Sequence, residues 1–185
     1  MEKKDRPYTV VPYDPKWPKN YEHEKNIISK IFGKQAQDIQ HIGSTSVKGM
    51  WAKPQIDILV IVDNLDTVDN VMIQMQSAGY AYQPDFFTKH NEKYFVRDAP
   101  SGQRLVSVHV MQKNDPKALS HICFRNYLRE HPTERELYSQ IKKRAYESGL
   151  NRVEYPKMKR VVLTTMLERA NNWYHVNNQK PNKRG

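Results

Sequence analysis

The stretch from Gln55 to Val62, QIDILVIV, constrains the fold most strongly, because it has the pattern of a strand covered on both faces. It is almost continuously apolar and rich in β-branched side chains. Side chains alternate between the two faces of a strand, so Asp57, Leu59 and Ile61 point the same way. An ionised carboxylate on a covered face is costly unless it is paired, hydrogen-bonded or bound to a metal. The sequence therefore predicts a partner for Asp57 inside the fold.

Three parts of the chain could supply that partner. The Gly-Ser-Thr-Ser loop at residues 43–46 offers hydroxyl and backbone N–H groups. Lys53 lies four residues upstream of Asp57, and His109 lies in a later strand candidate on the same face as Ser107. These alternatives stay open at this point.

Hydrophobic periodicity predicts helices at both ends of the chain and strands in the middle. Helical patterns cover residues 17–33, 65–80, 133–149 and a last segment from Pro156 to Trp173, and helical spacing begins near Lys117. Strand patterns cover residues 38–42, 55–62, 80–83, 93–98 and 104–111, with a hairpin signal, Pro-Ser-Gly, between the last two. This order predicts an α+β fold in which helices pack on a sheet.

The helix predicted for residues 133–149 has two further signals. Thr133 and Glu136 form a capping-box pattern at its start. Leu137, Ile141 and Ala145 form an apolar stripe, which predicts the buried face of the helix.

Length and composition limit the kind of protein. The 185 residues suit one domain, predicted for 1–175, followed by a disordered polar tail at 176–185. No apolar run is long enough to cross a bilayer, and the first residues lack the apolar core of a secretory signal, so we expect no membrane association and a cytoplasmic location. The single cysteine, Cys123, is predicted to be a buried apolar side chain.

Positive charge is concentrated in the C-terminal third. Residues 125–185 carry 14 basic and 6 acidic side chains, so this segment contributes +8 to the net charge of +10 of the whole chain. Such an excess suits a phosphate-bearing ligand or RNA, although solvated helix faces also explain it. The basic helices therefore give one binding hypothesis, RNA, whose affinity would fall steeply with salt.

Several separated motifs resemble the GrpB proteins, a family within the nucleotidyltransferase superfamily that shares the fold of DNA polymerase beta. The motifs are VVPYDPKWPKNYEHE, HIGSTSVKGMWAKPQIDILV, VSVHV, FRNYLREHP and YPKMKRVVLTTMLERANNW. This resemblance implies a nucleotidyltransferase-like mixed or antiparallel sheet with an N-terminal helix and C-terminal helices packed on it. In that superfamily a Gly-Ser turn binds phosphates, and strand acids hold divalent metals.

The resemblance assigns roles to individual residues. Asp57 and His109 are expected to be catalytic and to bind a divalent metal, magnesium or manganese. The residues expected to bind a nucleotide or its phosphates are Gly43, Ser44, Thr45, Ser46, Lys53, Arg125 and Lys157.

Two departures from the superfamily pattern weaken the catalytic expectation. Leu59 stands where a second strand acid is expected, and Ser107 stands where GrpB proteins usually have the first of two histidines. The leading hypothesis is metal-dependent nucleotidyl transfer to or from a nucleotide or another phosphate compound. The alternative is a non-catalytic ligand-sensing or accessory module, for which the resemblance implies a link to coenzyme A or to a partner protein.

Overall fold

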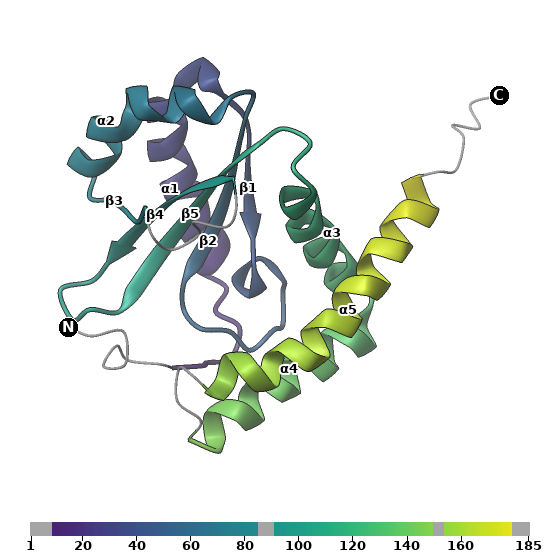
Figure 1. The fold of residues 1–185 in the computed structure, drawn as a ribbon. Coiled ribbons are helices and arrows are strands. Elements are labelled where there is room, and N and C mark those ends of the chain that lie inside the picture. The colour runs from purple at the N-terminus through teal and green to yellow at the C-terminus, as the bar shows by residue number, and fades with distance from the viewer. Residues whose placement is uncertain (1–8, 85–90, 150–153, 179–185) are drawn as a thin grey trace.

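The computed structural model describes residues 9–84, 91–149 and 154–178, and for residues 154–162 it describes only the backbone (Figure 1). Its helices are α1 (Trp17–Phe32), α2 (Met72–Ser77), α3 (Pro116–Glu130), α4 (Pro132–Glu147) and α5 (Glu154–Asn178). Short 3-10 helices are η2 (Gly33–Gln35), η3 (Ser44–Ser46) and η4 (Leu65–Val71). The strands are β1 (Ala36–Ile42), β2 (Ile56–Val62), β3 (Ala81–Tyr82), β4 (Glu92–Asp98) and β5 (Arg104–Gln112).

The five strands form one mixed sheet in the order β1-β2-β5-β4-β3. Only the central pair, β2 and β5, is parallel, and its register places Asp57 opposite Ser107 and Leu59 opposite His109. The other pairs are antiparallel. The α+β class and the mixed sheet expected from the sequence are confirmed. With this register His109 shares a face with Asp57, as expected if the strands pair as the family resemblance implies.

Helices cover both faces of the sheet (Figure 1). On one face α1 and α2 pack against an apolar layer that includes Ile58, Val60 and Val108, all fully buried. On the other face α3 packs over Ile42, Leu59 and neighbouring apolar side chains. This explains why β2 is apolar at nearly every position.

A separate apolar cluster ties the C-terminal helices to the loop after η3. It joins Val47 and Met50 to side chains from α3, α4 and α5, namely Tyr127, Leu128, Tyr138, Met166 and Ala170. The C-terminal helices therefore fix the position of the loop that follows the Gly-Ser turn.

Some local predictions were wrong for identifiable reasons. The helix predicted for residues 65–80 is present over residues 65–77, but its first part, residues 65–71, is a 3-10 helix, and the Asn64 side chain accepts a hydrogen bond from Asp66 N at 2.9 Å at its start. The capping box at Thr133 is not formed, because α4 begins at Pro132 and its first residues have no side-chain cap. The last helix begins by Glu154, so Pro156 lies in its first turn, where proline is tolerated.

The buried face of α4 is also shifted by one residue from the predicted stripe. Leu137 is 49% exposed, whereas Tyr138 and Lys142 are buried together with Ala145. The rotation places a lysine, rather than a leucine, against the rest of the protein.

Other expectations hold or lie outside what is described. Cys123 is buried, and the hairpin between β4 and β5 closes through Ala99 N to Gln103 O at 2.8 Å. Among the described residues no helix is long and apolar enough to span a bilayer. Helix α5 continues to Asn178, and residues 179–185 lie outside the described part, so the disordered tail and the cytoplasmic location stay predictions.

Candidate functional site

The site is organised by the contact between the Gly-Ser turn and Asp57. Strands β1 and β2 run antiparallel with Ile42 opposite Asp57, so the turn after β1 begins directly beside the carboxylate. Gly43 has φ of 69°, and a Cβ atom there would lie 2.4 Å from Asp57 Oδ2. Both the backbone conformation and the close approach therefore require glycine at this position.

Gln55 holds the carboxylate of Asp57 in place. Its Nε2 atom donates to Asp57 Oδ1 at 2.6 Å and to Ser107 Oγ at 2.9 Å. Ser107 in turn forms a 2.7 Å hydrogen bond with the hydroxyl of Tyr94. Within the described chain no other side chain hydrogen-bonds to Asp57. The prediction that Asp57 has a partner inside the fold holds, but that partner is Gln55, which the sequence did not single out.

The turn itself is braced by hydrogen bonds from both sides. Thr45 Oγ1 donates to Gln55 O at 3.0 Å and therefore accepts from His41 Nε2, also at 3.0 Å. Burial, together with the charges of Arg129 and Arg125, lowers the pKa of His41 from 6.5 to about 4. His41 is thus a neutral, structural histidine, stacked on Tyr21 at 4.7 Å between ring centroids.

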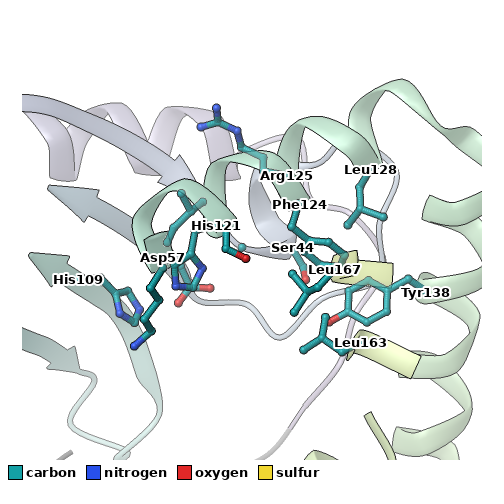
Figure 2. A pocket seen from close by; sticks show the side chains of 14 residues that line it. Ser44, Asp57, His109, His121, Phe124, Arg125, Leu128, Tyr138, Leu163 and Leu167 are labelled. Atoms are coloured by element: carbon teal, nitrogen blue, oxygen red, sulfur yellow. The ribbon is translucent and has the colours of Figure 1, made fainter. Parts of the chain in front are cut away.

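A pocket of about 400 Å³ lies in front of Asp57, and we call it the Asp57 pocket. It lies between the sheet and the three C-terminal helices (Figure 2). One end is polar, and the other is walled by aromatic and leucine side chains. The lining residues are Ile42, Gly43, Ser44, Asp57, His109, Lys117, Ser120, His121, Phe124, Arg125, Leu128, Tyr138, Leu163 and Leu167.

At the polar end, a buried carboxylate orients His109. Glu92, whose side chain is 1% exposed, accepts from His109 Nδ1 at 2.5 Å and from the ammonium of Lys117. Burial alone would raise the pKa of the Glu92 carboxyl, but the hydrogen bonds and charges of His109 and Lys117 outweigh it and hold that pKa below its usual value. An ionised carboxylate only accepts hydrogen bonds, so Nδ1 carries the hydrogen in the His109–Glu92 pair.

A second histidine lies beside this pair. The rings of His109 and His121 are 5.7 Å apart between centroids, and His121 Nε2 is buried without a hydrogen-bond partner in the structure. Burial, with the charges of His109 and Lys117, lowers the pKa of His121 from 6.5 to about 4. The pocket therefore presents a neutral imidazole next to an oriented one.

Lys142 brings a positive charge to the Gly-Ser turn. Its side chain is 5% exposed, its ammonium donates to Ser44 Oγ, and it lies 4.8 Å from the centroid of the Tyr138 ring. The sequence analysis missed Lys142 because the apolar stripe assigned a different face of α4 to the core. The nearest sequence signal was its position one residue after Ile141, inside the helix predicted for residues 133–149.

The structure separates the predicted site residues into groups. Gly43, Ser44, Asp57, His109 and Arg125 line the Asp57 pocket. Figure 2 shows that the Arg125 side chain points away from the other labelled groups, and its Nη1 donates to His41 O at 3.0 Å. It acts as a brace for β1.

Three other predicted residues, Thr45, Ser46 and Lys53, are not among the described residues that line this pocket, and a fourth is not tested. Thr45 is buried under the turn, and Ser46 faces the other side of it. Lys53 is half-buried in the loop before β2. The side chain of Lys157 lies outside the described residues.

The residues present do not fit a two-metal site. Leu59, at the place of a second strand acid, is fully buried in an apolar cluster with Ile42 and Met111. In the described part of the chain, no three His, Cys, Asp or Glu side chains are grouped as metal ligands. One carboxylate, Asp57, remains available for a cation that takes its other ligands from a phosphate and water.

Comparisons with known proteins agree with this fold. The sequence model of the GrpB proteins matches residues 7–169. A UPF0157 protein from Halalkalibacterium halodurans is 29% identical over 167 residues, which cover 88% of this chain and 82% of that protein. The crystal structure of GrpB from Enterococcus faecalis superposes with a TM-score of 0.82 at 33% identity, covering 90% of this chain and 99% of that one.

A more distant likeness concerns the fold alone. The Cid1 poly(U) polymerase, in a crystal structure bound to MgATP, superposes with a TM-score of 0.54 at 12% identity, covering 77% of this chain and 46% of that one. The sheet is thus of the nucleotidyltransferase type. Since the GrpB sequence model spans most of the chain, the protein belongs to the GrpB family.

Proposed function

We propose that this protein binds a nucleotide, or another compound with a phosphate group, in the Asp57 pocket. The observation that carries the proposal is the Gly43–Ser44 turn held against Asp57, with the Lys142 ammonium on Ser44. A buried cation beside a small polar turn suits a phosphate oxygen, because charge-assisted hydrogen bonds are strong where water is excluded.

A divalent cation, magnesium or manganese, completes the proposal. An ionised Asp57 repels a phosphate unless a cation lies between them, and magnesium commonly bridges one carboxylate and substrate phosphates while keeping several waters. Asp57 is the residue that would hold it, since its Oδ2 lies at the edge of the turn.

The apolar end of the Asp57 pocket supports a ligand with a flat or hydrophobic group. Phe124, Tyr138 and Leu163 line that end, away from Asp57 in Figure 2. A nucleoside base can stack on such side chains. Coenzyme A compounds join a nucleotide to a long pantetheine arm, so they are included in the test below.

Metal-dependent nucleotidyl transfer is the second candidate, and the His109–Glu92 pair favours it. In its neutral form, a histidine whose Nδ1–H is fixed by a carboxylate can take a proton from an attacking hydroxyl at its other nitrogen. The buried Leu59 favours a ligand-sensing or accessory module instead, because the second metal-binding acid is replaced. Turnover that requires metal and is abolished by both Asp57→Asn and His109→Gln would establish transfer.

Thermal unfolding with added ligand tests the binding proposal. Wild type, Asp57→Asn and the matched control Asp63→Asn would be heated with ATP, UTP, coenzyme A or dephospho-CoA, each with magnesium, manganese or no metal. Asp63 is an exposed acid just after β2. A ligand at 100 times its Kd stabilises the fold by about 2.7 kcal/mol, which raises Tm by about 5–10 °C for a chain of this length.

We expect metal-dependent stabilisation in wild type and Asp63→Asn, and its loss in Asp57→Asn. No shift with any ligand at millimolar concentration would contradict the proposal. An equal shift in all three proteins would place the binding elsewhere on the molecule.

A further inference from the structure

A second pocket, which we call the basic pocket, is lined by Ser46 and by the loop that follows it. It is open, with a volume of about 640 Å³. The loop after η3 forms one wall, and the end of α3 and the start of α4 form another. The lining residues are Tyr13, Ser46, Val47, Lys48, Gly49, Arg129 and Arg135.

The charge of this pocket is of one sign. Lys48, Arg129 and Arg135 contribute three cations, and no carboxylate is among the described residues that line the pocket. Within residues 9–84, 91–149 and 163–178, none of the three forms a salt bridge. Like charges gathered in one hollow repel one another, and a bound anion would offset that repulsion.

The two guanidinium groups are held in place by neutral acceptors. Arg129 donates from Nε and Nη2 to Ser46 O, at 3.2 and 2.8 Å. Arg135 Nη1 lies 3.4 Å from Leu128 O and 3.3 Å from Arg129 O. Backbone carbonyls fix the position of these side chains but do not neutralise their charge, so the site is pre-organised for an anion.

The loop adds backbone donors to the same pocket. Residues 47–50 form a tight turn closed by Met50 N to Val47 O at 3.3 Å, with Gly49 at φ of 84°. The N–H groups of Lys48 and Gly49 have no acceptor in the described chain. Backbone N–H groups beside arginine side chains are typical ligands of phosphate oxygens.

We propose that the basic pocket binds a phosphate group through Lys48, Arg129, Arg135 and the backbone of the Lys48–Gly49 turn. This site is separate from the Asp57 pocket, because the two have no described lining residue in common. The phosphate is either that of a small molecule or the phosphodiester of a single RNA strand.

The test uses the full chain, labelled with ¹⁵N, and two probes: inorganic phosphate and a ten-nucleotide oligouridine. Amide shifts are followed at Lys48 and Gly49, at 50 and at 200 mM salt. Lys48→Gln and Arg135→Gln each remove one cation of the basic pocket. Arg144→Gln is the matched control, since Arg144 is exposed on the same helix as Arg135 and does not line the pocket.

We expect saturable shifts at both amides, and an affinity that is about fivefold weaker in Lys48→Gln and Arg135→Gln but unchanged in Arg144→Gln. If RNA binds more tightly than phosphate and loses affinity with salt, the phosphodiester is the source. If RNA gives no gain over phosphate, a small molecule is the source.

Two results would overturn the proposal: no shift at Lys48 and Gly49 with either probe at 10 mM phosphate, or an equal loss of affinity in Arg144→Gln. Asp57→Asn should bind both probes as wild type does. The experiment therefore distinguishes a wrong proposal for the Asp57 pocket from a wrong proposal for the basic pocket.

Discussion

The two faces of the sheet are built from the same strands but differ in chemistry. On the face toward α1, Ile58, Val60 and Val108 are fully buried in one apolar layer. On the face toward α3, the alternate positions of β2 and β5 hold Asp57 and His109. Strand alternation thus lets one short sequence supply both the core and the site. The first face is apolar, whereas the second combines an apolar cluster with the polar end of the Asp57 pocket.

Each face also has a carboxylate that accepts two side-chain hydrogen bonds, and the two carboxylates bind residues of different kinds. Glu24 of α1 accepts from the hydroxyl of Tyr80 at 2.5 Å and from the guanidinium of Arg97, which joins α1 to the strands. Glu92 accepts from two residues that line the Asp57 pocket. We therefore expect changes at Glu24 to affect stability alone, and changes at Glu92 to affect the site as well.

The largest expected effect is on the apolar face. Ile58→Ala should lower the free energy of unfolding by about 2–5 kcal/mol, because the side chain is fully buried and leaves a cavity, whereas Ile58→Val should cost about 0.5–1.5 kcal/mol. Urea unfolding measures both. The comparison fails if Asp57→Asn, on the opposite face, destabilises the protein more than Ile58→Ala does.

Acid should destabilise the protein through His41 and His121. Both have a folded pKa of about 4, below the value of 6.5 for an exposed histidine, so the unfolded chain binds protons first as the pH falls. Their stabilisation is complete above pH 6.5 and is lost toward pH 4, by about 2 kcal/mol for each histidine at pH 4.5.

The matching measurement is urea unfolding at pH 7 and pH 4.5. His41→Gln and His121→Gln should each reduce the difference between the two pH values relative to wild type. NMR titration that shows either imidazole gaining its proton near pH 6.5 in the folded protein would contradict this account.

Gly43→Ala tests whether the glycine of the turn is needed more than other glycines with positive φ. The new Cβ would meet Asp57 Oδ2, so we expect a loss of about 1–3 kcal/mol together with loss of ligand binding. Gly33→Ala is the control, since Gly33 also has positive φ but a Cβ atom there would have nothing within 4 Å, and it should cost about 1 kcal/mol. Equal losses of unfolding free energy in the two variants would mean that the close approach to Asp57 has no effect.

The subtlest difference should appear between Glu24→Gln and Glu92→Gln. Only Glu92→Gln should change the ¹⁵N shifts of His109, because an amide can donate to Nδ1 and permit the other tautomer. Glu24→Gln should lower stability and leave both His109 and ligand affinity as in wild type. Identical His109 spectra in wild type and Glu92→Gln would show that the carboxylate does not set the tautomer.

The regular part of this fold could be predicted from local sequence. The strand at residues 55–62 follows from apolar patterning and alternation, whereas the Gly-Ser turn and the shared face of Asp57 and His109 were expected from the family resemblance. The segment 65–71 was misjudged because its apolar spacing is compatible with both helix types, while Asn64 and Asp66 favour a tighter first turn.

The missing site residues depend on contacts between distant parts of the chain. Glu92 and His109 meet only because β4 pairs with β5, and Lys142 reaches Ser44 only because α4 turns a different face inward. Gln55 lies directly before β2, but an uncharged polar residue at the end of a strand is common and does not by itself indicate a site. None of these residues has a local pattern that separates it from a surface side chain.

The most direct test of the central claim is an amide NMR map of the full chain titrated with MgATP and MgUTP. The account predicts saturable shifts at Gly43, Ser44 and Asp57, which are absent in Asp57→Asn and retained in Asp63→Asn. Shifts confined to Lys48 and Gly49, or none at millimolar nucleotide, would contradict nucleotide binding in the Asp57 pocket.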